Sequence, residues 1–98
     1  MNAMKVAVQY LGFIRELLRT KGEEFELKEG AVLADVLNEI AQTHGEKFRK
    51  EVFEAGDSDV KTGFAVTVNG FLAGQLKGLA TPLKADDSII LMTLPSGG

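Results

Sequence analysis

The feature that most constrains the fold is one amphipathic stretch flanked on both sides by segments of alternating polarity. Its apolar residues recur at i, i+3, i+4 and i+7, at Leu33, Val36, Leu37 and Ile40. This spacing predicts a helix with a single apolar stripe. Asp35 in the first turn and His44-Gly45 at the end suit the charge preference of helix termini and a glycine C′ position. The stripe has to be buried, and the flanking segments can supply a sheet for it.

The segments before this helix predict two strands joined by a short helix. Residues 5–10 alternate in polarity, with Val6, Val8 and Tyr10 on one face. Residues 13–18 carry apolar side chains at helical spacing. Residues 23–27 alternate again, so we expect a strand antiparallel to the first, with Phe25 and Leu27 inward and the acids outward.

The segments after the helix predict three further strands. Residues 64–68 form a strand, and Asn69-Gly70 is a strong turn signal because both residue types tolerate positive φ. Residues 71–73 begin a short return strand, and the turn at 84–87 leads into the last strand, 88–94. Between 48 and 63 the signal is weak: Phe48, Val52 and Phe53 can cover a core edge, and 54–59 reads as a surface loop.

This element order predicts an α+β fold of the β-grasp (ubiquitin-like) type. Two antiparallel hairpins with one main helix across them give a mixed sheet of four to five strands, in which the first and last strands lie parallel at the centre. The 98 residues suffice for one domain, which we place at 1–98 with a flexible tail at 94–98. The same pattern leaves a split βαβ sandwich open as an alternative.

Composition excludes several classes of function. The absence of cysteine rules out disulfides, thiolate zinc sites, iron–sulfur clusters and cysteine nucleophiles. Eleven basic residues against 14 acidic ones give a net charge of −3, which disfavours nucleic acid as a partner. No apolar run approaches the roughly 18 residues that span a bilayer, so we expect a cytoplasmic protein without membrane contact. The one histidine, His44, is expected to be a helix-end residue rather than a base or metal ligand, and no metal site is expected.

The chain ends in a distinctive segment, Thr93-Leu94-Pro95-Ser96-Gly97-Gly98. Two residues without Cβ can enter a narrow enzyme channel, so that the terminal carboxylate reaches a buried nucleotide. Pro95 fixes its own φ and biases Leu94 toward extended geometry, which lowers the entropy lost on binding. From Pro95 onward the chain can reach about 13 Å. The alternative is a frayed terminus without function.

The last strand is apolar on both faces. Ile89 and Leu91 alternate with Ile90, Met92 and Leu94, although a sheet covered on one side needs only one apolar face. The excess indicates a patch beside the tail that another protein covers, with Phe71 and Leu72 as further candidates. Loops of the same chain are the alternative cover.

Several of these segments together resemble the MoaD and ThiS family of ubiquitin-like sulfur carriers. The resemblance rests on residues 5–17, the segment Val68-Asn69-Gly70, the acidic turn at 84–89 and the ending Pro95-Ser96-Gly97-Gly98. It covers nearly the whole chain. The chain is more similar to MoaD than to ThiS because it is longer and has Arg15-Glu16-Leu17 after the first strand.

The resemblance implies a carrier that is not an enzyme by itself and binds no cofactor. A ubiquitin-activating-like adenylyltransferase would use ATP to adenylate Gly98, and a sulfur donor would then replace the nucleotide to leave a thiocarboxylate. For MoaD-like members the sulfur goes to a pyranopterin held by the large subunit of molybdopterin synthase. The residues expected to bind partners are Leu94, Pro95, Ser96, Gly97, Met92 and Phe71.

The tail departs from the family pattern, which keeps other functions open. Tails of this type often carry a proline pair and a valine where this chain has Thr93-Leu94-Pro95. Small archaeal modifiers and Urm1-like proteins share the remaining features, so conjugation to other proteins or thiolation of tRNA is the first alternative. A β-grasp interaction module whose tail has no chemical role is the second.

Overall fold

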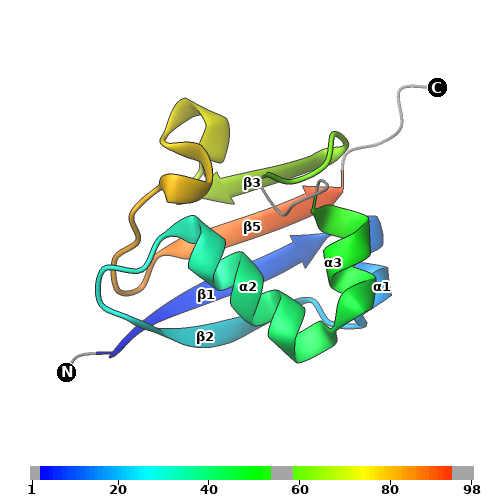
Figure 1. Cartoon of the computed structure of the whole chain (residues 1–98), viewed down its shortest axis with the longest axis horizontal. Helices are drawn as coiled ribbons and strands as arrows, with labels where there is room; N and C mark the ends of the chain where they lie inside the picture. The colour runs from blue at the N-terminus through cyan, green and yellow to red at the C-terminus, as the bar shows by residue number, and fades with distance from the viewer. Residues whose placement is uncertain (1–2, 54–58, 94–98) are drawn as a thin grey trace.

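The computed structural model describes residues 3–53 and 59–93. In chain order the elements are β1 (Ala3–Leu11), α1 (Phe13–Leu18), β2 (Gly22–Lys28), α2 (Leu33–His44), α3 (Glu46–Val52), β3 (Phe64–Val68), β4 (Phe71–Leu72), the 3-10 turns η2 (Ala73–Gln75) and η3 (Gly78–Ala80), and β5 (Ser88–Thr93). One five-stranded sheet has the order β2-β1-β5-β3-β4, and α2 crosses one of its faces (Figure 1). The predicted β-grasp fold is confirmed.

The register of the sheet fixes which residues face the helix layer. β1 and β5 lie parallel at the centre, with Val8 opposite Ile89 and Tyr10 opposite Leu91. β3 pairs with β5 and β2 pairs with β1, both antiparallel. Because side chains alternate between faces, every second residue of these strands points toward α2. The parallel pairing of β1 with β5 confirms the predicted arrangement of the first and last strands.

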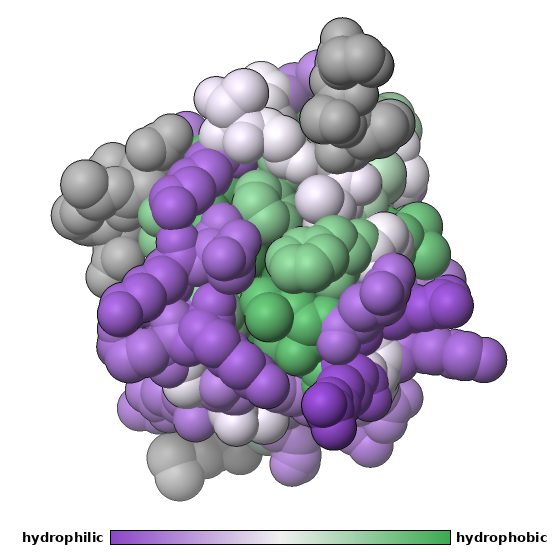
Figure 2. Space-filling view, turned by 90° about the vertical axis from the view of Figure 1, so that its right-hand side faces the viewer, coloured by the Kyte–Doolittle hydropathy of each residue, from purple (hydrophilic) through white to green (hydrophobic). Residues whose placement is uncertain are grey.

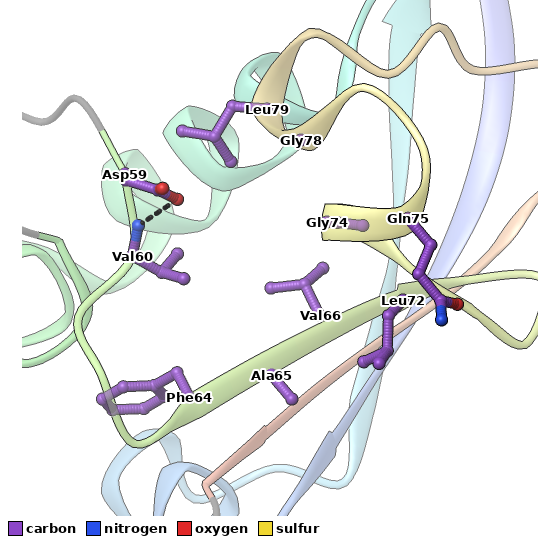
Figure 3. Close-up of a pocket in the computed structure, with 11 residues that line it drawn as sticks. Asp59, Val60, Phe64, Ala65, Val66, Leu72, Gly74, Gln75, Gly78 and Leu79 are labelled. Atoms are coloured by element: carbon purple, nitrogen blue, oxygen red, sulfur yellow. Dashed lines mark hydrogen bonds between the residues drawn. The ribbon is translucent and has the colours of Figure 1, made fainter.

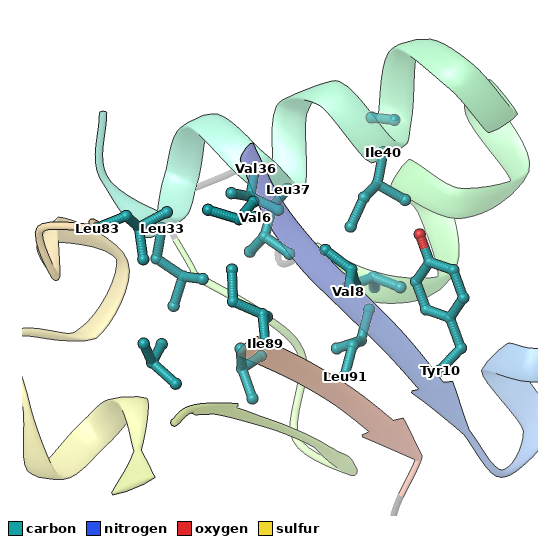
Figure 4. Close-up of a cluster of buried hydrophobic side chains, with 14 of the residues drawn as sticks. Val6, Val8, Tyr10, Leu33, Val36, Leu37, Ile40, Leu83, Ile89 and Leu91 are labelled. Carbon is teal, nitrogen blue, oxygen red and sulfur yellow. The ribbon is translucent and has the colours of Figure 1, made fainter. Parts of the chain in front are cut away.

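The core lies between α2 and this face of the sheet. The predicted stripe, Leu33, Val36, Leu37 and Ile40, is fully buried, as are Ile89 and Leu91 on β5. Figure 4 shows the helix side chains facing those of β1 and β5. At the start of α2 the Val32 N–H donates to the Asp35 carboxylate at 2.8 Å, and at its end Gly45 has φ +87°. Both predicted helix ends are correct.

The weak signal after residue 45 corresponds to a second helix, α3. It begins directly after Gly45 and buries Phe48 and Val52, one turn apart, against the end of the core. The Phe48 ring meets Phe53 edge-on at 6.0 Å between centroids. The expectation that 48–53 covers a core edge is confirmed. Most of the predicted loop at 54–59 lies outside the described residues.

One expected orientation is wrong. Glu23 does not face solvent with the other acids of β2, because its position in the register places it on the core side with Phe25. Its Oε2 accepts a hydrogen bond from the Tyr10 hydroxyl at 2.8 Å and lies 2.6 Å from Nε2 of His44. These contacts satisfy a half-buried carboxylate and join β1, β2 and the end of α2.

Within the described residues, no helix is both long and apolar enough to cross a membrane. The same part of the chain contains no cluster of His, Cys, Asp or Glu able to hold a metal ion.

Candidate functional site

The predicted reactive group is the carboxylate of Gly98, five residues beyond the end of β5. Leu94, Pro95, Ser96, Gly97 and Gly98 all lie outside the described residues. What the structure places is the point where the tail begins, Thr93, together with the surface around it. In Figure 1 this end of β5 lies at the same end of the molecule as α1 and α3.

Thr93 is held by two different elements. On one side it pairs with Phe64 of β3. On the other side its Oγ1 accepts a hydrogen bond from the Ile14 N–H at 2.9 Å. Gly12, between β1 and α1, has φ +79°, and a Cβ there would lie 3.0 Å from the Thr93 carbonyl oxygen. The last described residue of β5 is thus fixed between β3 and the start of α1.

A partly exposed apolar surface lies on the sheet face opposite α2. Because Ile89 and Leu91 point into the core, Ile90 and Met92 point to the other face. Met92 lies between Leu11 of β1 and Ala65 of β3. Leu72 extends the surface at β4, where it pairs with Thr67 and is 46% exposed. We call the five residues Leu11, Ala65, Leu72, Ile90 and Met92 the open-face patch.

The open-face patch adjoins the end of the molecule where the tail begins. Leu11 and Met92 are paired one residue before Gly12 and Thr93, respectively. Phe13, the first residue of α1, is 51% exposed. Figure 2 views this end and shows hydrophobic residues gathered at its centre, with hydrophilic residues to the left and below. A partner that grips the tail would therefore meet an apolar surface around its starting point.

The structure does not bring Phe71 to this place. Phe71 pairs with Val68, which in turn pairs with Ile89 at the start of β5, whereas the tail begins at its end. It is 61% exposed and lines a separate hollow with Leu76, Lys77 and Lys84. Met92 and Phe71 thus belong to two different surfaces.

The polar residues of the acidic turn have a structural role. Asp87 is buried, and its carboxylate accepts hydrogen bonds from the Asn69 side-chain amide at 2.9 Å and from the Lys84 N–H at 2.8 Å. The Asn69 side-chain oxygen accepts the Ser88 N–H at 2.9 Å. The Asn-Gly turn and the acidic turn therefore close one hydrogen-bond network at the start of β5, away from the tail.

A hollow beside β3 offers no catalytic set. It has a volume of about 310 Å³ and is lined mainly by apolar residues, among them Val60, Phe64, Val66 and Leu79 (Figure 3). Its one acid is Asp59, whose carboxylate accepts the neighbouring Val60 N–H at 2.8 Å. This hollow therefore lacks a base, a nucleophile and a group of metal ligands among its lining residues.

Comparison with known proteins identifies the family. The sequence profile of the ThiS family matches residues 8–98. The chain therefore belongs to the ThiS family, a family of ubiquitin-like sulfur carriers that are not enzymes by themselves. A search of curated proteins gives no match.

Solved structures show the same fold. A putative molybdopterin converting factor subunit 1 from Pyrococcus furiosus is 33% identical over 94% of this chain and 99% of its own, with a TM-score of 0.73. Small archaeal modifier protein 1 from Methanosarcina acetivorans is 25% identical over the whole of both chains, with a TM-score of 0.82. CysO from the BexX/CysO complex of Amycolatopsis orientalis is 20% identical over 95% of this chain and 99% of the compared chain, with a TM-score of 0.72.

Sequence reasoning missed the residues around the start of the tail. Leu11 and Ala65 had no signal of their own, because their place in the open-face patch follows from strand order and register. The contact between Ile14 and Thr93 joins residues 79 positions apart. Gly12 could have been a signal, because a glycine directly after a predicted strand can mark a turn or a close approach of two backbones.

Proposed function

We propose that this chain carries sulfur as a thiocarboxylate on Gly98 and donates it in molybdopterin biosynthesis as the small subunit of molybdopterin synthase. The observation that carries the proposal is membership of the ThiS family over a range that includes the Gly-Gly terminus. The molybdopterin role is supported by the 33% identity to the Pyrococcus furiosus protein, which is named as a molybdopterin converting factor subunit.

The chemistry takes place in two steps at one carbon atom. A carboxylate oxygen of Gly98 attacks the α-phosphorus of ATP, and pyrophosphate leaves to give an acyl adenylate. A sulfur donor at the oxidation level of sulfide then attacks the carbonyl carbon, and AMP leaves with the oxygen that joined it to the chain. Activation is needed because a carboxylate is a poor electrophile, whereas the adenylate has a good leaving group. ATP is used by the partner enzyme and not held by this chain.

The two chemical steps require partner proteins, because this chain supplies only the carboxylate that reacts. A ubiquitin-activating-like adenylyltransferase would bind the tail, and the large subunit of molybdopterin synthase would hold the pterin and supply the catalytic side chains. Both would use the open-face patch beside the tail, because it is the apolar surface adjoining Thr93. CysO from Amycolatopsis orientalis, which shares the fold, is seen in a complex with BexX and so offers a precedent for a protein partner.

The absence of cysteine makes the test of sulfur transfer sharp. The chain is incubated with the adenylyltransferase of its source cell, ATP and sodium sulfide, and is then treated with N-ethylmaleimide. Because the chain has no thiol of its own, only a thiocarboxylate can take the label. We expect one label per chain by intact mass, and none without ATP or in a chain lacking Gly97 and Gly98. The wild-type chain remaining unlabelled would contradict sulfur transfer.

The proposed role as small subunit of molybdopterin synthase has a separate test. The thiocarboxylated chain is added to the large subunit of molybdopterin synthase from the same cell, together with the cyclic pyranopterin substrate. We expect the chain to lose its thiocarboxylate sulfur, and with it the reaction with N-ethylmaleimide, as the dithiolene product forms. If the sulfur stays on Gly98 in this mixture, the carrier serves another acceptor.

Protein conjugation is the second candidate function. It is favoured by the similarity to small archaeal modifier protein 1, which covers both chains completely. In this case the adenylate would react with a lysine amine of a target protein, which forms an amide and releases AMP. Branched Gly-Gly remnants on lysines of other proteins from the source cell would support conjugation. Their absence, with thiocarboxylate present, would leave sulfur transfer as the function.

A further inference from the structure

Thr93, the last described residue of β5, lies one residue beyond the end of the pairing between β1 and β5. Leu11 and Met92 form the last pair between these strands, so Thr93 has no partner on β1. At that level the chain has turned at Gly12 into α1, and the Ile14 N–H takes the place of a strand contact by donating to Thr93 Oγ1 at 2.9 Å. Thr93 therefore keeps support on both sides, from Phe64 and from Ile14.

The local sequence is suited to this contact. The first N–H groups of a helix have no partner within the helix, and α1 has no side-chain cap from its own N-cap residue. The Thr93 hydroxyl satisfies one of these groups from the far end of the chain. Glycine at position 12 suits this approach, because its φ is +79° and a Cβ there would make tight contacts, 3.0 Å from the Thr93 carbonyl oxygen and 3.3 Å from the Thr93 Cβ.

We propose that Thr93 is a positioning residue for the chemistry at Gly98. This inference rests on the proposed function. The hydroxyl bond to Ile14 fixes Thr93, five residues before Gly98, and so restricts where the reacting carboxylate can lie. Without the bond, the Phe64–Thr93 pair at the end of the ladder is free to open, and the fixed point moves back to Met92. The partner then has to order Thr93 before the carboxylate reaches the α-phosphorus.

The positioning role of Thr93 can be measured separately from binding of the chain to its partner. The open-face patch and its neighbours set the affinity for the partner, and Thr93 makes no part of that patch. Loss of the Thr93 hydroxyl should therefore lower the rate of adenylation in the complex and leave formation of the complex nearly unchanged. A purely structural role would instead lower stability without changing the rate of the folded protein.

The test compares Thr93→Val, which loses the hydroxyl at nearly constant shape, with Thr93→Ser, which keeps it. The control is Thr43→Val on the exposed side of α2, where the hydroxyl donates only to the Glu39 carbonyl of the same helix. Pyrophosphate release by the adenylyltransferase of the source cell gives kcat and KM with each chain as substrate, at a temperature where all are folded. Titration calorimetry without ATP gives Kd.

We expect Thr93→Val to lower kcat about fivefold, the factor that corresponds to ordering one residue, with Kd within about twofold of wild type. Thr93→Ser should restore most of the rate, and Thr43→Val should behave as wild type. In the free chain, protection of the Ile14 amide against hydrogen exchange should fall in Thr93→Val and return in Thr93→Ser. Equal kcat for wild type and Thr93→Val, or equal Ile14 protection, would overturn the positioning role alone. A wild-type chain that releases no pyrophosphate would overturn the proposed function, and the positioning role with it.

Discussion

The two faces of β5 differ although both are apolar in sequence. Ile89 and Leu91 are fully buried beneath α2, whereas Ile90 and Met92 are half-buried on the opposite face. The first pair is covered by α2, whereas the second lies beside Leu11 of β1 and Ala65 and Thr67 of β3 and stays partly exposed among the described residues. A strand at the centre of a sheet with one covered face needs apolar residues on that face alone. The comparison teaches that stability depends on one set of alternate residues of β5, and under the proposed function we expect the other set to bind partners.

The largest expected effect tests the covered face. Leu91→Ala should lower the free energy of unfolding by about 3 kcal/mol, because it removes a fully buried side chain and leaves a cavity. Met92→Ala, one residue further on, should cost less than about 1 kcal/mol since that side chain is already partly hydrated. Urea unfolding followed by circular dichroism measures both. Equal losses for the two variants would mean that the faces do not differ as described.

The open face has the complementary test. Met92→Glu should weaken binding to the adenylyltransferase at least about tenfold, because a charge would be buried in an apolar interface. The melting temperature should change little. The control is Gln42→Glu, which adds the same charge at an exposed position of α2, on the covered side of the sheet. A Met92→Glu chain that unfolds instead would show that Met92 belongs to the core.

A smaller effect concerns the polar contact at the edge of the core. Burial, followed by the hydrogen bond to Glu23 and the charge of Glu23, raises the pKa of Tyr10 well above its ordinary value. The neutral phenol is favoured in the folded state, so this contribution is complete below the unfolded pKa of about 10 and is lost as pH rises above it. Between pH about 9 and about 11, the wild type should lose about 1 kcal/mol more stability than Tyr10→Phe. Parallel losses in urea unfolding at the two pH values would contradict the raised pKa of Tyr10.

The smallest effect concerns Thr67 of β3, which lies on the open face between Ile90 of β5 and Leu72 of β4. Its hydroxyl is buried and has no hydrogen-bond partner among the described residues. Thr67→Val should therefore raise the free energy of unfolding by up to about 1 kcal/mol. Thr81→Val is the matched opposite case, because the Thr81 hydroxyl donates to the Gly78 carbonyl and accepts the Lys77 N–H. A loss of stability in Thr67→Val as large as in Thr81→Val would mean that the Thr67 hydroxyl is satisfied.

The elements that could be predicted from sequence are those with a local period. The α2 stripe and the strands around it repeat over enough residues to define a face, and β3 was predicted with its observed bounds. The helix α3 could not be predicted with the same clarity, because its seven residues bury only Phe48 and Val52. A pattern of two apolar positions does not distinguish a helix from a loop that covers the core.

The features that sequence did not predict depend on contacts between distant residues. Glu23 lies on the inward face of β2 because of the register, and sequence could not show that Tyr10 and His44, from two other elements, both reach its carboxylate. The tail was predicted as the reactive end, but its support by Gly12 and Ile14 joins opposite ends of the chain. The separation of Met92 from Phe71 follows from strand direction, since the turn at Asn69-Gly70 lies at the start of β5.

The central claim is that Gly98 leaves the adenylating partner with sulfur in place of oxygen. The most direct measurement is made on the chain purified from its source cell, alkylated with N-ethylmaleimide and digested with trypsin. Cleavage after Lys84 releases residues 85–98, a peptide without cysteine or lysine. The account predicts a fraction of this peptide with the label on Gly98, and its disappearance in cells that lack the adenylyltransferase. A peptide found only with an unlabelled carboxylate, under conditions in which the cell makes molybdopterin, would contradict it.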